Sequence, residues 1–194
     1  MELHTSDDLR ACHDAALAGR RVVRLKGGDP AIFGRTDEKV RALHAAGVKV
    51  RICPGITTTS AAAASAGISL SLRGIARRVQ LVTAHSRCGR ALDVDWPAPA
   101  APGSTLAFCM GRDAAEISRA LIAAGACPAA PVVVACDVSL ATERMLRTGL
   151  DLPPIVAAAF ASDRPTLILV GEAVSPPGRA VLEEAGAARL RAVS

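Results

Sequence analysis

Short apolar runs alternate with stretches of helical periodicity along most of this chain, and this alternation limits what it can fold into more than any other feature. The runs are rich in valine, isoleucine and leucine, as is typical of strands covered on both faces. Strands that alternate with helices predict an α/β fold of mostly parallel sheets flanked by helices. The predicted strands are Val22–Leu25, Val48–Cys53, Val79–Thr83, Thr105–Met110, Val132–Cys136 and Thr166–Val170, with a further antiparallel strand in the hairpin-forming stretch Glu143–Gly149.

Helical patterns fill the gaps between these runs. The expected helices are one after a capping box at Thr5 and Asp8, one over Asp37–Ala46, one in the alanine-rich run Thr57–Ala66, and one from a second box at Asp113 and Glu116 to Gly125. The alanine-rich helix is expected to pack close to its neighbours. The apolar stripe of the first helix consists of Leu9, Cys12, Ala16 and Leu17.

The 194 residues are enough for one ordinary domain or for two small lobes with a buried core. Residues 68–78 have no clear period and are the expected connection between two lobes. The sequence therefore predicts an amino-terminal lobe over residues 1–67, a carboxy-terminal lobe over residues 79–173, and a tail or helix over residues 174–194.

The net charge of +5 is uneven along the chain. Residues 1–78 hold 13 lysines and arginines against 7 aspartates and glutamates, whereas residues 79–194 hold 10 against 11. A basic half suggests an anionic partner, either nucleic acid or a small polycarboxylate. Aromatic residues make up only 2% of the chain, which leaves little for base stacking, so a small anionic ligand is favoured over nucleic acid.

No apolar run approaches the roughly 20 residues of a membrane span, and the amino terminus lacks the order of a secretory signal. A cytoplasmic protein without a membrane partner is therefore expected. The six cysteines form no Cys-x-x-Cys pair and no histidine pair has metal-ligand spacing, so the cysteines are interpreted as structural and no metal site is predicted.

The segment with the most chemical information runs from Val22 to Arg35. A strand leads directly into Gly27 and Gly28, whose missing Cβ atoms allow a tight turn and let a ligand touch the backbone. Asp29 then offers a carboxylate at the carboxyl edge of the sheet, which suits an amine or ribose hydroxyls better than phosphates. Neither of the common glycine-rich nucleotide motifs, G-x-G-x-x-G and G-x-x-x-x-G-K-[ST], occurs. The alternative is that Gly-Gly-Asp-Pro is simply a turn.

The whole segment resembles the signature of the uroporphyrinogen-III C-methyltransferases, within the tetrapyrrole methylase superfamily. The resemblance begins with Leu25–Pro30 and Ile32–Arg35 and continues in the same order along almost the entire chain. The further matching segments are Pro54-Gly55-Ile56-Thr57, Ala66-Gly67-Ile68, Val82-Thr83-Ala84-His85, Thr105–Gly111 and Leu169-Val170-Gly171-Glu172.

This resemblance implies a two-lobed methylase fold and a reaction. Methyl groups would pass from S-adenosylmethionine to two ring carbons of uroporphyrinogen III, giving precorrin-2 through precorrin-1, at the branch point to sirohaem and cobalamin. Because the ring carbon is electron-rich and the methyl group is already activated, catalysis needs mainly positioning and a later proton removal, with no metal or nucleophilic triad. A homodimer is also implied.

The resemblance implies cofactor contacts at Gly27, Gly28, Asp29, Ile32, Thr57, Thr58, Met110 and, through its backbone, Val138. Arg35 would meet a substrate carboxylate through a bidentate contact. Other interpretations stay open, since Ile32 and Met110 could be core residues, Thr57 an N-cap and Arg35 a surface charge. No catalytic residue is assigned, and His85, at the end of a predicted strand, is given no role.

The chain also departs from the family pattern. The family begins with a strand and a Gly-x-Gly-Pro-Gly loop that have no counterpart here, so the first lobe is expected to be incomplete and the isolated chain unstable or inactive. The substituted positions are Thr36-Asp37, Ser69, Ser71-Leu72, Ala84, Cys109 and Val138. Three alternatives to the methyltransferase therefore stay open: a methylase acting on a later precorrin, a non-catalytic remnant with a binding or dimerisation surface, and an RNA-binding module.

Overall fold

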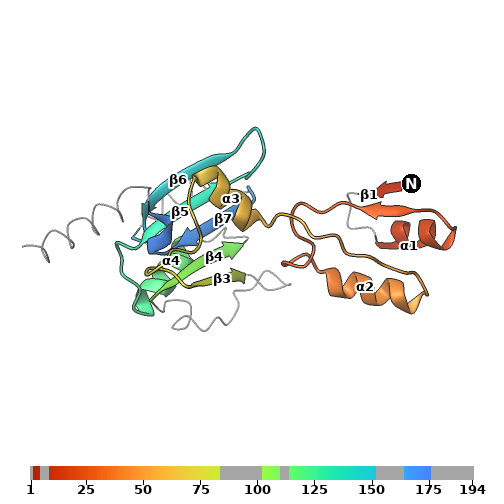
Figure 1. Cartoon of the computed structure of the whole chain (residues 1–194), viewed down its shortest axis with the longest axis horizontal. Coiled ribbons are helices and arrows are strands. Elements are labelled where there is room, and N and C mark those ends of the chain that lie inside the picture. Colours follow the sequence, from red (N-terminus) through yellow and green to blue (C-terminus); the bar gives the residue numbers. More distant parts are fainter. Residues whose placement is uncertain (1, 5–8, 84–101, 110–113, 152–163, 176–194) are drawn as a thin grey trace, which may run out of the picture. The chain divides into compact units, whose positions relative to one another are not determined.

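The computed structural model describes residues 2–4, 9–83, 102–109, 114–151 and 164–175 (Figure 1). By its internal contacts the chain divides into two compact units, Met1–Thr57 and Thr58–Ser194. This division lies before the connection expected over residues 68–78. The predicted lobe boundaries at residues 67 and 79 stay a prediction.

The first unit contains a small parallel sheet and two helices. Strand β1 (Glu2–His4) pairs in parallel with β2 (Val22–Arg24), and α1 (Leu9–Leu17) connects them. The sequence did not predict β1, whereas α1 and β2 confirm predictions; the capping box at residues 5–8 lies outside the described residues. Leu17 was expected on the inward stripe of α1, but it is 58% exposed, and Cys12 and Ala15 are the buried positions among residues 10–17.

Helix α2 (Thr36–Ala45) ends as its sequence predicts. Gly47 has a φ of +75°, and the backbone N–H of Gly47 donates to the carbonyl of His44 while that of Val48 donates to the carbonyl of Leu43. This left-handed closure satisfies carbonyl groups that the end of a helix leaves unpaired.

The strand predicted over Val48–Cys53 is wrong. These residues have irregular structure and pair with no strand in the described part of the chain. The apolar pattern satisfied the local preference for a strand, but a strand also needs a hydrogen-bonded neighbour, and the sheet of this unit consists of β1 and β2 alone among the described residues.

The second unit contains a five-stranded sheet in the order β3-β4-β7-β5-β6. Its strands are β3 (Arg78–Thr83), β4 (Ser104–Cys109), β5 (Pro131–Cys136), β6 (Arg144–Gly149) and β7 (Thr166–Val170). All five confirm predicted strands to within a residue or two, including the antiparallel strand predicted in the stretch 143–149.

The expectation of mostly parallel sheets is wrong for this unit, although the α/β class with a helix-flanked sheet is confirmed. Only β3 and β4 pair in parallel, while the other three pairings are antiparallel. The physical reason is that burial on both faces produces the same continuous apolar pattern in either direction, and β7, in the middle of the sheet, is buried at all five positions.

Two helices cover the two faces of this sheet. Helix α4 (Ala114–Ala123) packs Ile117 and Leu121 into one core with Phe108 of β4. Helix α3 (Thr58–Ala66) covers the opposite face and packs on β4 and β7, with Ala62 fully buried (Figure 1). The alanines of α3 let its backbone approach the sheet closely, which confirms the expected close packing of this helix.

After β7 the chain forms a short 3-10 turn, η1 (Glu172–Val174). Residues 176–194, which include nearly all of the predicted tail or helix, lie outside the described residues. No described helix combines the length and the apolar character that crossing a membrane requires.

Candidate functional site

The glycine pair lies directly after β2 in the first unit. Gly27 is exposed, and a Cβ atom built on it would meet no atom within 4 Å. The backbone of Gly27 is therefore open to the surroundings, and its contact with a ligand stays a prediction. The open space at Gly27 is the room that a bound molecule would need to approach the main chain.

Asp29 joins this turn to a second turn of the first unit. One of its carboxylate oxygens accepts the backbone N–H of Ala31 at 2.7 Å, and the other accepts that of Gly55 at 3.0 Å. These two hydrogen bonds, with Gly55 the stronger cause, hold the pKa of Asp29 below its ordinary value of 3.8, so the carboxylate is ionised at neutral pH. The side chain thus links the Gly-Gly-Asp-Pro and Pro-Gly segments, which the sequence treated as separate motifs.

Gly55 fits this contact because it is glycine. A Cβ atom at Gly55 would lie 2.9 Å from the carbonyl oxygen of Gly28 and 3.3 Å from the Cα of Asp29. Any larger residue would push the two turns apart. The sequence gave no role to Gly55, and the structure identifies it as part of the candidate site.

The loop from Pro30 to Thr36 is compact and strained. A Cβ atom at Gly34 would lie 2.3 Å from the carbonyl oxygen of Pro30, and the hydroxyl of Thr36 donates to that same oxygen. Phe33 and Arg35 have φ values of +50° and +51°, a left-handed conformation that is uncommon for residues other than glycine. Such strain is typical of loops that present side chains at functional sites.

Ile32 and Arg35 both lie at the surface of this loop. Ile32 is 36% exposed, which excludes the alternative interpretation of this residue as a core residue of the unit. The guanidinium of Arg35 lies 3.0 Å from the carboxylate of Glu38 in the first turn of α2. Arg35 is thus a paired surface charge in this structure, and its predicted contact with a substrate carboxylate stays a prediction.

In the second unit, β4 and β5 lie on either side of β7 and end at the same end of the sheet. Both strands pair antiparallel with β7, so they run in the same direction, and their last residues, Cys109 and Cys136, pair with the adjacent residues Leu167 and Thr166. The chain after β4 and the chain after β5 therefore leave the sheet at one edge. Met110 comes directly after β4 but lies outside the described residues, as does His85.

The first turn of α3 reaches this same edge. The hydroxyl of Thr59 lies 3.8 Å from the sulfur of Cys109, and Thr59 is buried while Thr58 is exposed. Burial raises the pKa of the Cys109 thiol, with the Thr59 hydroxyl opposing it, so this thiol stays neutral. Thr57 is the last residue of the first unit.

Val138 lies in the turn that follows β5 at this edge. It is partly buried and packs against the core on the α3 side of the sheet. The residues on either side of it, Asp137 and Ser139, have φ values of +51° and +68°. The turn is thus held in an unusual backbone conformation, which is consistent with the predicted contact through the backbone of Val138.

The sequence missed two carboxylates in this turn. The Asp137 carboxylate accepts hydrogen bonds from Thr142 and Arg164, and the Glu143 carboxylate accepts the backbone N–H of Ser139 at 2.6 Å and the hydroxyl of Ser65 at 3.3 Å. Two acidic residues within seven positions after a buried strand are the signal that could have identified them.

The structure therefore gathers the predicted site residues in two places. Gly27, Gly28, Asp29, Ile32 and Arg35 lie on one loop of the first unit, with Gly55 added. Thr58 and Val138 lie at one edge of the sheet in the second unit. The two groups belong to different units, and each is described here by itself.

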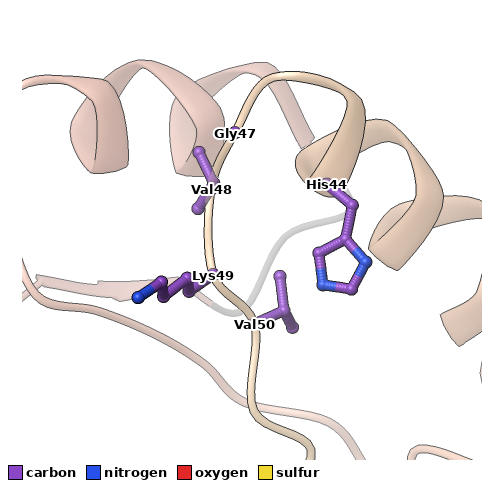
Figure 2. Close-up of a pocket in the computed structure, with 5 residues that line it drawn as sticks. All are labelled: His44, Gly47, Val48, Lys49 and Val50. Atoms are coloured by element: carbon purple, nitrogen blue, oxygen red, sulfur yellow. The ribbon is translucent and has the colours of Figure 1, made fainter.

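An open hollow lies elsewhere in the first unit, at the end of α2. It is lined by His44, Gly47, Val48, Lys49 and Val50, and Figure 2 shows the His44 ring and the Val50 side chain facing the same space while Lys49 points away. None of these residues belongs to the predicted site. The lining contains no carboxylate and no cluster of polar groups, so we do not consider the hollow a functional site.

Comparison with known proteins identifies the family. A family model of tetrapyrrole (corrin/porphyrin) methylases matches residues 2–153. The siroheme synthase of Gluconacetobacter diazotrophicus is 42% identical over 160 residues, which cover 82% of this chain and 34% of that protein. Siroheme synthase 1 of Yersinia enterocolitica is 44% identical over 160 residues, which cover 82% of this chain and 33% of that protein. The chain thus spans about a third of the length of these curated relatives.

Solved structures agree with this relationship. A cobalt precorrin-4 methyltransferase superposes with a TM-score of 0.78 and 27% identity, covering 89% of this chain and 73% of that one. The uroporphyrin-III C-methyl transferase from Thermus thermophilus, complexed with S-adenosyl homocysteine, superposes with a TM-score of 0.71 and 33% identity, covering 86% of this chain and 72% of that one. Since the family model matches well over half of the residues, this chain belongs to the tetrapyrrole (corrin/porphyrin) methylase family.

Proposed function

We propose that this chain carries an S-adenosylmethionine-dependent C-methyltransferase activity toward uroporphyrinogen III, forming precorrin-2 through precorrin-1 for sirohaem or cobalamin synthesis. The observation that carries the proposal is the Asp29 clamp, in which an ionised carboxylate holds the Gly-Gly-Asp-Pro and Pro-Gly turns together beside the open backbone of Gly27. Relatives named siroheme synthase and a neighbour named uroporphyrin-III C-methyl transferase support the choice of substrate.

The residues of the first unit fit S-adenosylmethionine. A bound cofactor of this kind carries amine and ribose hydroxyl donors and a positively charged sulfonium, all of which a carboxylate at Asp29 would favour. Gly27 has room for a ligand against its main chain, and the exposed side chain of Ile32 offers an apolar contact. In the second unit, Thr58, Met110 and the backbone of Val138 are the proposed contacts, and Thr57 is proposed beside Thr58.

Arg35 is the proposed contact for the substrate. Uroporphyrinogen III carries several carboxylates, and a guanidinium can hold one of them through two parallel hydrogen bonds. Since Arg35 is paired with Glu38 at the surface, binding would exchange one carboxylate partner for another, and no buried charge would be left alone. This exchange would orient the ring without a large cost in desolvation.

The proposed reaction requires the chain mainly to position the cofactor and the substrate. When bound, S-adenosylmethionine would supply an activated methyl group to the ring carbon and would leave as S-adenosylhomocysteine. The residues of the chain would align the two reactants, and the methylated ring would then lose a proton to water. We assign no catalytic residue to this proton removal.

We also propose a cytoplasmic homodimer that binds neither nucleic acid nor membranes. The resemblance to the family supports the dimer, and the scarcity of aromatic residues supports the absence of a nucleic-acid partner. The lobe boundaries at residues 67 and 79 are part of the same proposal.

Two measurements on the purified chain test the proposed function. Calorimetry with S-adenosylhomocysteine measures cofactor binding, and incubation with S-adenosylmethionine and uroporphyrinogen III, followed by mass spectrometry, measures addition of two methyl groups. We expect binding and double methylation. Binding without transfer supports a non-catalytic remnant, and transfer to a later precorrin alone supports a different methylase of the family. The absence of both, with RNA binding that persists at high salt, favours the RNA-binding alternative.

A further inference from the structure

Asp137 connects the turn after β5 to the start of β7 in several ways. Its backbone N–H donates to the carbonyl of Pro165 at 3.1 Å, and its carbonyl accepts the N–H of Leu140 at 2.9 Å. Its carboxylate oxygen Oδ2 accepts the hydroxyl of Thr142 at 2.8 Å and the guanidinium of Arg164. Main chain and side chain of one residue thus fix the turn on both sides.

The strand ends next to this residue are also joined. The sulfur of Cys136 lies 3.4 Å from the hydroxyl of Thr166, and that hydroxyl donates to the carbonyl of Arg164 at 2.9 Å. Asp137 therefore extends a network that already connects the last residue of β5 to the first residue of β7. Arg164, two residues before β7, contacts both Asp137 after β5 and Thr166 at the start of β7.

The Asp137 contacts hold a conformation that the backbone does not favour. Positive φ values at Asp137 and Ser139 place one left-handed residue on each side of Val138, a conformation that is unfavourable for residues other than glycine. The surroundings must therefore determine this turn. The Asp137 side chain is only 9% exposed and its partner Arg164 is 40% exposed, so the ion pair is partly shielded from water, and loss of either partner would leave the other charge partly buried and without its ionic partner.

We propose that Asp137 and Arg164 are positioning residues for cofactor binding, which act by fixing the backbone at Val138. The proposal rests on the proposed function, because it requires Val138 to contact S-adenosylmethionine through its main chain. Oδ2 of Asp137 is already occupied by Thr142 and Arg164, so the carboxylate acts through the turn and does not need to touch the ligand. A turn held in its bound conformation spares the cofactor the cost of ordering it.

The test is a double-mutant cycle on the full chain with Asp137→Asn, Arg164→Gln and both together, read by calorimetry with S-adenosylhomocysteine. Asparagine keeps the size of aspartate and tolerates a left-handed φ, so Asp137→Asn removes the charge and leaves the local preference of the backbone intact. We expect each single variant to weaken binding about tenfold and the double variant to be no weaker than the singles. Asp37→Asn, which removes the exposed ion pair with Arg41, is the matched control and should bind as the wild type does.

Kinetic constants of the Asp137 and Arg164 variants distinguish positioning of the cofactor from a merely structural role. Positioning predicts that KM for S-adenosylmethionine rises about tenfold while kcat at saturating cofactor changes less than about twofold. Equal cofactor affinity in wild type and a folded Asp137→Asn variant overturns the inference and leaves the proposed function standing. Failure of the wild type to bind S-adenosylhomocysteine overturns both. If Asp137→Asn does not fold, Arg164→Gln alone tests the inference, because the more exposed Arg164 side chain tolerates replacement. Unchanged affinity for S-adenosylhomocysteine in Arg164→Gln then overturns the inference.

Discussion

The carboxylate of Asp29 accepts a hydrogen bond from the backbone N–H of Gly55 at 3.0 Å, across 26 positions of sequence. This contact joins two short motifs into one structural element of the first unit. It also explains why position 55 needs glycine, since a side chain there would separate the two backbones. The predictions for the first unit follow from it.

Asp29→Asn should weaken cofactor binding. The amide keeps the shape of the side chain but removes the charge and one of the two acceptor oxygens that hold Ala31 and Gly55. We expect the affinity for S-adenosylhomocysteine, measured by calorimetry, to fall about tenfold or more. Asp14→Asn removes an exposed aspartate that pairs with His13 on α1 and serves as the control. Equal losses in the two variants would contradict a specific role for Asp29.

The clamp should also depend on pH. Because the folded state lowers the pKa of Asp29 below 3.8, its contribution to stability is fully present above that value and is lost as the pH falls through the lowered pKa. We expect the difference in urea midpoint between wild type and Asp29→Asn to stay constant from about pH 7 to about pH 5 and to shrink in stronger acid. A difference that persists unchanged at about pH 2 would show that the carboxylate charge is not its source.

Gly27→Ala and Gly34→Ala should affect different properties, although they are the same substitution on one loop. A Cβ atom at Gly27 meets nothing within 4 Å, whereas at Gly34 it would lie 2.3 Å from the backbone oxygen of Pro30. We expect Gly27→Ala to change the free energy of unfolding by less than about 0.5 kcal/mol while weakening S-adenosylhomocysteine binding. Gly34→Ala should lower the free energy of unfolding by about 1–3 kcal/mol.

Urea unfolding and calorimetry on the two glycine variants separate these effects. If Gly27→Ala binds as well as wild type, no ligand approaches the main chain at this position. If Gly34→Ala is as stable as wild type, the loop relaxes more easily than its close contact with Pro30 implies.

Arg35→Gln should affect the substrate and leave the cofactor unaffected. The Arg35–Glu38 pair is exposed on both sides, so its loss should cost less than about 1 kcal/mol of stability. We expect KM for uroporphyrinogen III to rise about tenfold or more, with unchanged affinity for S-adenosylhomocysteine. Arg41→Gln, which breaks the Arg41–Asp37 pair on the same helix, is the control. An unchanged KM would leave Arg35 as an ordinary surface charge.

The sequence determined the elements whose signals are local. Apolar runs predicted the strands of the second unit. A glycine suited to a left-handed conformation predicted the end of α2 at Gly47, and small side chains predicted the close packing of α3. The candidate cofactor loop was also readable, because glycines and an aspartate directly after a strand limit the backbone and chemistry within a few residues.

Tertiary structure decided what depends on partners distant in sequence. Burial on both faces gave β7 the same pattern whichever way its neighbours run, so only the fold made both of its pairings, with β4 and with β5, antiparallel. The run Val48–Cys53 had the composition of a strand but no neighbour to pair with in the described structure. The links from Asp29 to Gly55 and from Asp137 to Arg164 join residues 26 and 27 positions apart, and a hydrogen bond of that kind exists only once the fold has brought donor and acceptor together.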